Sequence, residues 1–273
     1  MTEKIHTKKV AIGGLGAIGA VLAKKLDEGI PGLELVAVSG RDVAKAERFV
    51  AGLKKPVPVL PLGRLAEVAD IVVEAAPAAL MDEVAVPTLT AGRWLVMSSV
   101  GVLLRSPHLV ELAKKHGGRI LVPTGALIGL DAMLAAREGT VQSLKMVTRK
   151  PPGGLEGAPY LVEHNISLKD LKEPKLVFSG TATEAVKGFP ANVNVSAALG
   201  LAGIGADKTN IEIWADPGVT RNIHRIEVEA DSARFSMMIE NVPSEENPRT
   251  GKITALSVVA LLRKLACPVA VGT

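Results

Sequence analysis

The sequence predicts an α/β protein with a doubly wound parallel sheet of the Rossmann type, followed by a second α/β (α+β) domain. A glycine-rich turn follows the first apolar run, and apolar runs then alternate with helical patterns up to residue 123. Beyond that point, several segments alternate apolar and polar residues with period two. The first pattern indicates βαβ units, and the second indicates strands with one solvated face. The 273 residues are enough for two domains.

The first element is a strand over residues 9–12 that ends in Gly14-x-Gly16-x-x-Gly19. These glycines allow a tight turn, a close backbone approach to a pyrophosphate and tight packing of the next helix. The free N–H groups at the start of that helix would then face the phosphates. An ordinary glycine-rich turn is the alternative, but helical spacing over 20–26 favours a nucleotide site formed by Gly14, Leu15, Gly16, Ala17, Ile18 and Gly19.

The rest of the first half repeats the strand–helix pattern. Strands are expected at residues 33–38, 57–60, 71–75, 94–97 and 119–122. Helices are expected at residues 42–50, 62–68, 81–90 and 108–116, the first of them capped by Asp42. Most of the strands are continuous apolar runs, as expected for a sheet that is covered on both faces.

The second half of the sequence does not continue the regular alternation of strands and helices. Residues 143–150 are expected to form a strand, and 183–189 and 194–201 helices. Residues 210–215, 223–229 and 233–240 alternate with period two, which predicts an antiparallel sheet. The apolar segment 250–265 predicts a helix that returns to the first domain. We therefore expect one domain from 1–123 completed by 250–273, and a second domain from 124–249.

Composition excludes several classes of protein. The net charge of +4 is dispersed and aromatic residues make up only 3%, which argues against nucleic-acid binding. No apolar run is long enough to cross a membrane, and no spaced His/Cys cluster indicates a metal. The single cysteine, Cys267, is expected to be a buried small hydrophobe. A cytoplasmic protein is the expectation.

Ligands bind outside the carboxyl ends of the strands in such a sheet. The candidate cofactor residues there are the glycine turn together with Ser39, Arg41, Ala75, Ala76, Pro77 and Ser98. An NAD-specific site normally has an acid near the end of the second strand, where this chain has Ser39 and Arg41. Either NAD or NADP is therefore expected. Alternatively, Arg41 is an ordinary surface residue and Asp42 bonds the ribose.

Histidine is the candidate acid/base because its ordinary pKa lies near neutral pH. His224 lies where a polar loop meets an alternating strand, beside Arg221 and Asn222, which could hold carboxylates. From spacing alone, a structural and a catalytic histidine are both open.

Several ordered motifs resemble the L-aspartate dehydrogenase family. They are Gly14-Leu-Gly-Ala-Ile-Gly19, Pro123-Thr-Gly-Ala-Leu-Ile-Gly-Leu-Asp-Ala132, Thr148-Arg-Lys-Pro151, Phe189-Pro-Ala-Asn-Val-Asn-Val195, Arg221-Asn-Ile-His-Arg-Ile-Glu-Val228 and Glu240-Asn-Val-Pro-Ser-Glu-Glu-Asn-Pro248. The resemblance implies a second domain that carries the active site and the subunit contacts of a homodimer or higher oligomer. It also implies NAD(P)-dependent oxidation of L-aspartate to iminoaspartate, which feeds NAD biosynthesis or yields oxaloacetate and ammonia.

Carried over to this chain, the family's active-site histidine matches His224, and its cofactor-contacting residues match Ala126 and Asn192. Candidates for the substrate carboxylates are Arg221, Asn222, Leu127, Ile128 and Gly129, with Arg149 and Lys208 as weaker ones. The extra Gly13 and the Ser39–Arg41 segment depart from the family pattern. Two alternatives are a related NAD(P) enzyme for another aspartate-derived compound and a non-catalytic dinucleotide sensor.

Overall fold

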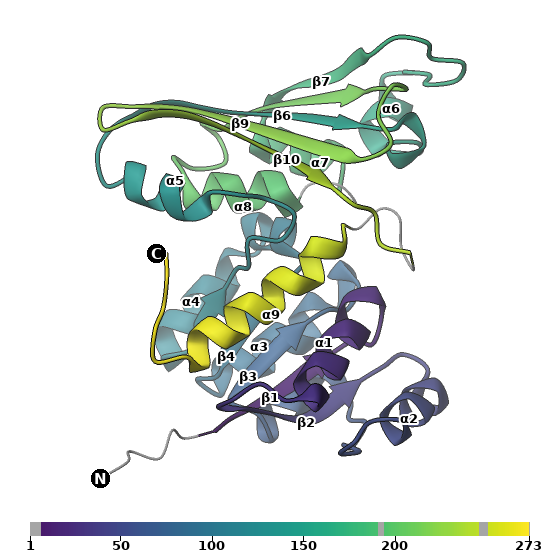
Figure 1. Cartoon of the computed structure of the whole chain (residues 1–273), viewed down its shortest axis with the longest axis vertical. Coiled ribbons are helices and arrows are strands. Elements are labelled where there is room, and N and C mark those ends of the chain that lie inside the picture. Colours follow the sequence, from purple (N-terminus) through teal and green to yellow (C-terminus); the bar gives the residue numbers. More distant parts are fainter. Residues whose placement is uncertain (1–6, 191–193, 246–250, 273) are drawn as a thin grey trace. The chain divides into compact units, whose positions relative to one another are not determined.

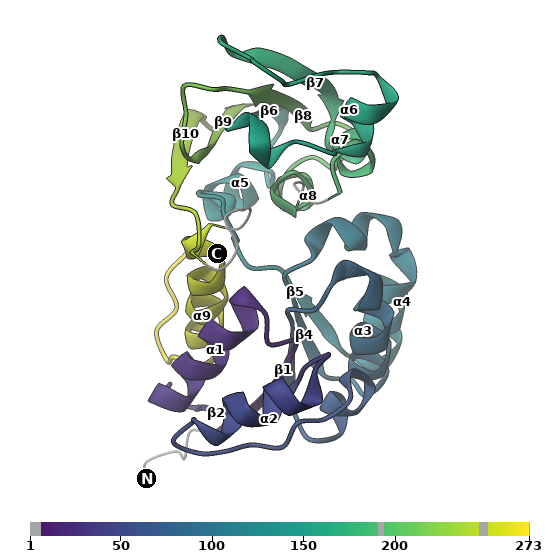
Figure 2. The same cartoon turned by 90° about the vertical axis from the view of Figure 1, so that its right-hand side faces the viewer.

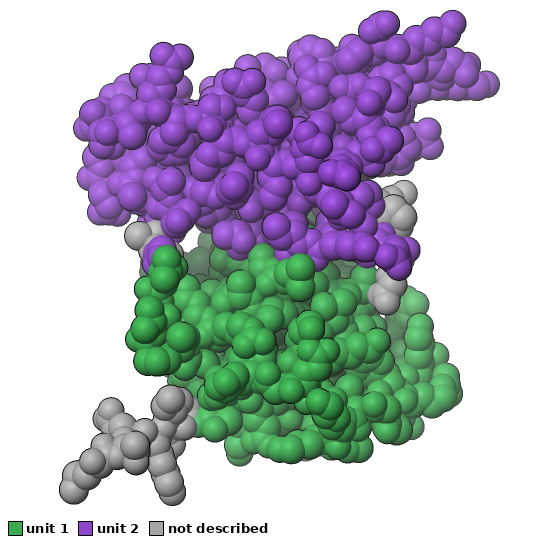
Figure 3. Space-filling view, in the orientation of Figure 1, with its two compact units in different colours: residues 1–123, 254–271 green, residues 124–253, 272–273 purple. Residues whose placement is uncertain are grey.

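A computed structural model describes residues 7–190, 194–245 and 251–272 of the chain. The chain divides into two compact units, which Figure 3 shows in different colours. The first unit comprises the residues up to 123 together with 254–271, and the second comprises 124–253 with the last two residues.

The first unit contains a five-stranded, fully parallel sheet in the order β2-β1-β3-β4-β5. Its strands are β1 (Lys8–Gly13), β2 (Leu33–Ser39), β3 (Ile71–Glu74), β4 (Trp94–Met97) and β5 (Arg119–Leu121). Because all five strands are parallel, their carboxyl ends lie at one edge of the sheet, where the ligand of such folds binds.

Helices cover both faces of this sheet. The helices are α1 (Ala17–Glu28), α2 (Val43–Ala51), α3 (Met81–Thr90), α4 (Pro107–His116) and α9 (Lys252–Ala266), with short 3₁₀ turns η1 (Leu62–Glu67), η2 (Ala78–Leu80) and η3 (Val100–Arg105). One hydrophobic cluster joins α1, α9 and the end of α2 to the sheet, and another joins η1, α3 and α4 to it. Figure 2 shows α1 and α9 on one side of the sheet and α3 and α4 on the other. The predicted doubly wound sheet is confirmed.

The second unit contains a mixed sheet in the order β10-β9-β6-β8-β7. Its strands are β6 (Val141–Lys150), β7 (Lys175–Thr181), β8 (Asn210–Ala215), β9 (Asn222–Ala230) and β10 (Arg234–Asn241). The connecting elements are α5 (Leu130–Ala136), η4 (Pro152–Gly154), α6 (Pro159–Glu163), α7 (Ala182–Gly188) and α8 (Asn194–Ala202). Figure 1 shows α5 and α8 on one face of the sheet, here called the inner face.

The predicted antiparallel arrangement of the second sheet was partly wrong. Strand β8 lies beside β6 and runs parallel to it, because the chain returns between them through η4, α6, β7, α7 and α8. The β7 strand was not predicted at all. It begins beyond a polar, proline-containing stretch and mixes polar with apolar residues, so its period is weak.

Three smaller features also differ from the prediction. Residues 57–60 form only one bridge, between Val59 and Val38, because the prolines at 56 and 58 lack the N–H that a ladder requires. Residues 62–67 form a 3₁₀ helix in place of an α-helix. Cys267 is exposed, since α9 ends at Ala266 and Pro268 prevents the helix from continuing.

The close packing in the turn between β1 and α1 predicts that a larger residue at Gly19 would destabilise the fold. A Cβ on Gly19 would collide with the backbone carbonyl of Gly14, which cannot move without opening the turn. Gly19→Ala should therefore lower the free energy of unfolding by about 1–3 kcal/mol, measured by urea denaturation. Gly52→Ala is the control, because a Cβ there meets only Phe49 O at 3.5 Å. Equal stability of both variants would contradict the close packing of α1 against its strand.

Candidate functional site

The glycine turn leaves room for a ligand at the start of α1. Gly14 has φ +115°, and a Cβ there would lie 2.5 Å from the carbonyl oxygen of Ala75. Gly16 differs, because no atom lies within 4 Å of the position of its Cβ. Helix α1 begins at the next residue without a side-chain cap on its amides. Open space beside uncapped helix amides fits the pyrophosphate of a dinucleotide.

Backbone hydrogen bonds bring the neighbouring loops to the same edge of the sheet. Gly14 N donates to Ser39 O at 3.0 Å, and Ala75 N donates to Gly13 O at 2.9 Å. The predicted cofactor residues of β1, β2 and β3 are therefore neighbours. Leu15 and Ile18 of the turn also pack against the hydrophobic cluster of α1 and α9, so these side chains contribute to the core.

Glu74, the last residue of β3, is a site residue that the sequence analysis missed. Its side chain is almost fully buried and accepts hydrogen bonds from Ser98 N at 3.0 Å, Ser99 N at 2.8 Å and Ser99 Oγ at 3.0 Å. Burial raises the pKa of this carboxyl group, and the hydrogen bonds from Ser99 and Ser98 oppose that rise. Ser98 Oγ is buried without a hydrogen-bond partner among the described residues. The sequence signal for Glu74 was an acidic residue at the end of an otherwise apolar strand.

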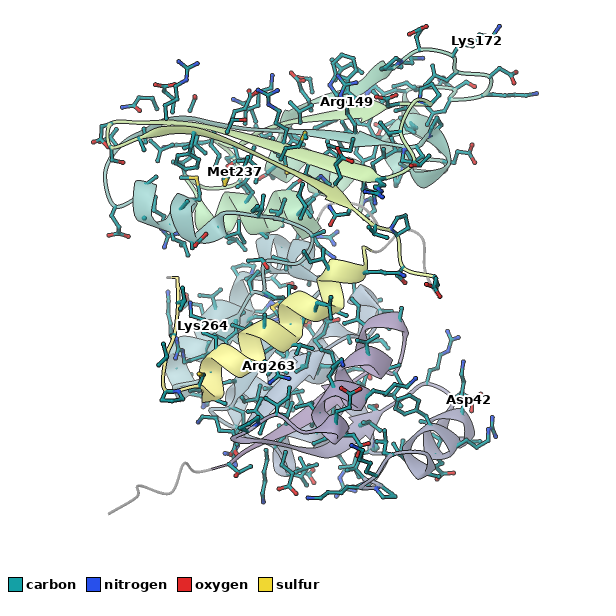
Figure 4. All side chains as sticks on the ribbon, in the orientation of Figure 1. Asp42, Arg149, Lys172, Met237, Arg263 and Lys264 are labelled. Carbon is teal, nitrogen blue, oxygen red and sulfur yellow. The ribbon has the colours of Figure 1, made fainter. Side chains whose placement is uncertain are left out.

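The end of β2 carries the candidates for cofactor choice. Ser39 is buried at the end of the strand, and Arg41 is exposed two residues later. The carboxylate of Asp42 accepts the backbone N–H of Lys45 at 2.9 Å and so caps α2 (Figure 4). This capping role favours Arg41 over Asp42 as the group nearest to a 2′-substituent of a bound ribose.

In the second unit, the inner face of the sheet changes from apolar to polar at one end. Leu144 and Met146 of β6 are fully buried there, and the next two residues on the same face are Thr148 and Lys150. His224 pairs with Thr148 across the β6–β9 ladder, and its Nδ1 lies 3.0 Å from Thr148 Oγ1. The imidazole is only 2% exposed.

The charges at this polar end favour a neutral imidazole. Burial, reinforced by the positive charge of Lys150, lowers the pKa of His224 to about 3. Burial also lowers the pKa of Lys150 to about 8. At neutral pH, His224 is therefore unprotonated, while Lys150 is mostly charged.

The predicted loop 126–129 joins this region through β10. Asn241, the last residue of β10, donates from Nδ2 to Ala126 O at 3.1 Å, and its Oδ1 is buried without a partner among the described residues. Asn241 pairs with Asn222, the first residue of β9. Gly129 has φ +72°, and the side chain of Met237 packs directly against it. Leu127 is buried, whereas Ile128 is partly exposed.

The other candidate residues for substrate and cofactor differ in their surroundings. Arg149 faces away from the helices (Figure 4), forms an ion pair with Asp216 at 2.9 Å and stacks over Trp214. These contacts give Arg149 a structural role. Arg221 and Lys208 are exposed, and Asn192 lies outside the described residues. Thr148, Lys150 and Asn241 were not predicted as site residues, although the period-two pattern of β6 places Thr148 and Lys150 on the same face as His224.

Two structural absences complete the description. Within the described ranges, no three His, Cys, Asp or Glu side chains gather where they could hold a metal ion. Over the same residues, no helix has the length and hydropathy needed to span a bilayer.

A glycine-rich turn with open space beside the uncapped amides of α1, on a parallel sheet, is typical of nicotinamide-dependent oxidoreductases. Residues 14–123 match the family described as homoserine dehydrogenase, NAD binding domain, and residues 131–265 match aspartate dehydrogenase, C-terminal. The chain belongs to the aspartate dehydrogenase family.

Individual relatives agree with this assignment. The chain is 59% identical to an L-aspartate dehydrogenase of Bradyrhizobium diazoefficiens, over 97% of this chain and 94% of the relative. It is 55% identical to L-aspartate dehydrogenase 3 of Bordetella bronchiseptica, over 97% of each chain. A crystal structure of aspartate dehydrogenase from Thermotoga maritima superposes with a TM-score of 0.74 at 25% identity, covering 98% of this chain and all of the other.

The open space beside Gly16 predicts that a larger side chain at this position would block cofactor binding. Gly16→Val should abolish NAD(P) binding and leave the fold intact, because the new side chain fills the space that the pyrophosphate needs. Binding is measured by titrating NADH fluorescence, and folding by circular dichroism. An unchanged dissociation constant would mean that the glycine turn is structural only.

The exposed Arg41 makes a prediction about cofactor choice. Its guanidinium can pair with a 2′-phosphate through charge-assisted hydrogen bonds, so NADP should be used at least comparably to NAD. Arg41→Ala should weaken NADP binding by about 1.5–3 kcal/mol and leave NAD binding unchanged. Ser39→Asp should shift preference toward NAD. The measurement is kcat/KM for both cofactors, and an equal effect of Arg41→Ala on the two would show that this residue does not contact the 2′-phosphate.

Proposed function

We propose that this protein oxidises L-aspartate to iminoaspartate, with NAD or NADP as hydride acceptor and His224 as acid/base. The observation that carries this proposal is the buried hydrogen bond between Thr148 and His224 at the polar end of an otherwise apolar sheet face. The curated relatives named above are L-aspartate dehydrogenases, which supports aspartate as the substrate.

The first unit would hold the cofactor. The amides at the start of α1 would bind the pyrophosphate beside Gly16, and Ser39 and Arg41 would contact the ribose end. Glu74 fixes the backbone of Ser98 and Ser99 through its carboxylate, and so shapes the edge at the end of β4. When bound, the nicotinamide ring supplies the hydride acceptor, while the protein contributes mainly position.

Residues of the second unit would accept and donate the protons of the reaction. If Nδ1–H of His224 donates to Thr148 Oγ1, the lone pair of Nε2 is available as the base for the substrate amine. The pKa of about 3 applies without substrate, and two substrate carboxylates nearby would raise it, since negative charge favours the imidazolium. Asn222 and the 126–129 loop would orient the carboxylates. The same histidine could return a proton when water converts iminoaspartate to oxaloacetate and ammonia.

One assay separates this function from its alternatives. Production of NAD(P)H is measured with L-aspartate, L-homoserine and a panel of other amino acids. Turnover limited to L-aspartate supports the proposal, and turnover of another aspartate-derived compound would favour a related enzyme. Cofactor binding without turnover of any compound would favour a dinucleotide sensor. Trapping iminoaspartate, before water can attack it, would show whether it is available for NAD biosynthesis.

The role of His224 predicts a selective loss of catalysis. His224→Ala should lower kcat by a factor on the order of 10² to 10⁴, because a general base of this kind contributes about that much. The dissociation constant for NADH should change little, since the histidine is assigned to proton transfer. Turnover near that of the unmodified protein would remove His224 from the mechanism.

The environment of His224 also predicts the pH profile. A histidine with an ordinary pKa of 6.5 would lose its basic form as the pH falls through that value, whereas His224, with a pKa of about 3, stays unprotonated. The pH profile of kcat/KM reports the titrating groups of the free enzyme. As the pH falls through 6.5, protonation of His224 should therefore cause no decrease in kcat/KM. Such a loss, present in the unmodified protein and absent in His224→Asn, would contradict the buried neutral state.

A further inference from the structure

Glu74 is a buried acid at the centre of the edge where the parallel strands of the first unit end. It is the last residue of β3, the middle strand, and it pairs with Gly13 of β1 and Met97 of β4. Its side chain lies inside the fold, with only 1% of the residue exposed. A carboxyl group that has lost its water is costly to bury unless hydrogen-bond donors replace that water.

The donors that replace the water come from two different loops. After β4, Ser98 N and Ser99 N donate to Oε2 of Glu74 at 3.0 and 2.8 Å, and Ser99 Oγ donates to Oε1 at 3.0 Å. After β3, the backbone N–H of Ala76 also donates to this carboxyl group. One side chain thus ties the loop that follows β3 to the loop that follows β4.

The loop after β3 also contacts the glycine turn. Ala75 N donates to Gly13 O at 2.9 Å, and a Cβ on Gly14 would lie 2.5 Å from Ala75 O. The segment that begins at Glu74 therefore lies against the turn that fits the pyrophosphate on one side. On its other side, the carboxyl group of Glu74 is bonded to the end of β4. The position of the β4 loop relative to the turn is set through this residue.

The two sides would meet different halves of a dinucleotide. A sheet of this type binds the dinucleotide across the point where the strand order reverses, which here lies between β1 and β3. Ser39 and Arg41, after β2, are the candidates for the adenosine half, so the ends of β3 and β4 are left for the nicotinamide half. Hydride transfer needs an accurate position of the ring, since a displacement of about 1 Å can lower the rate by about 100-fold.

We propose that Glu74 is a positioning residue for the nicotinamide half of the cofactor, because it holds the loops after β3 and β4 in place against the glycine turn. It acts through the backbone that it holds, and no proton transfer is assigned to it. This inference rests on the proposed placement of the cofactor in the first unit, and it does not depend on which substrate is oxidised.

The test compares NADH with ADP, which carries the adenosine half and the pyrophosphate but lacks the nicotinamide and its ribose. Both ligands are titrated by calorimetry into the unmodified protein and into Glu74→Met, which keeps the length of the side chain and removes its acceptors. The affinity for NADH should fall by about 10- to 100-fold, the range expected when buried donors lose their acceptor. The affinity for ADP should stay unchanged. A residue that only stabilised the sheet would affect both ligands alike.

Two variants serve as controls. In Glu74→Gln, the amide oxygen can accept the N–H groups of Ser98 and Ser99, and the NH₂ group can donate to Ser99 Oγ, so most of the ratio of NADH to ADP affinity should return. Thr88→Val removes another buried polar group of the same unit, a hydroxyl that donates to Val84 O at 2.6 Å within α3. This variant should leave the ratio unchanged.

Ser99→Ala provides a milder test that does not disturb the buried acid itself. It removes one hydrogen bond to Glu74 and keeps the two amide bonds, so it should lower the ratio in the same direction by a smaller factor. If Glu74→Met loses its circular dichroism spectrum, the ratio in Ser99→Ala decides the question.

The outcomes separate this inference from the proposed function. An equal loss of NADH and ADP affinity, or an unchanged ratio, would overturn the inference. A Glu74→Gln variant as impaired as Glu74→Met would overturn it too, since the charge and not the held loops would then matter. Absence of L-aspartate turnover in the unmodified protein would overturn the proposed function alone, because the comparison of NADH with ADP uses binding.

Discussion

The register between β6 and β9 is the constraint on which the candidate catalytic region of the second unit depends. It sets Thr148 opposite His224, and the pleat of β6 then puts Lys150 on the same buried face. A slip of β6 by one residue would turn Thr148 and Lys150 to the other face, away from His224. Leu144 and Met146, on the same face of the same strand, oppose that slip because they would lose their burial. The hydrophobic core of the second unit therefore also fixes the position of its polar cluster.

At the carboxyl ends of the parallel strands in the first unit, burial and hydrogen bonding also fix the position of polar groups. Glu74 would be costly to bury alone, and its acceptor oxygens are instead occupied by the amides and hydroxyl that follow β4. Gly14 and Gly19 allow backbone to approach backbone, whereas the space beside Gly16 is open. The same motif thus contains two glycines required by packing and one that leaves room for a ligand.

Local patterns in the sequence predicted the parallel sheet and most helices, because each depends on periodicity over a few residues. The pairing of strands that are far apart in the sequence was harder to predict. Nothing local shows that β8 lies beside β6, or that β7 completes the sheet. The candidate site residues Gly16 and His224 were named because they lie in sequence motifs. Lys150 and Glu74 were missed because their importance comes from burial, and a charged residue in a sequence ordinarily indicates surface.

The pair of His224 and Lys150 links substrate binding to protonation. Each positive charge at this end of the sheet disfavours the other, which is why the pKa of the imidazole is lowered by the ammonium as well as by burial. Two substrate carboxylates would reverse that balance, since they favour protonation of both groups. Under the proposed function, the imidazole would be a weak base in the free protein and a stronger one once the dicarboxylate binds. A proton acceptor that strengthens only beside its proper substrate would couple specificity to catalysis, without any movement of the sheet.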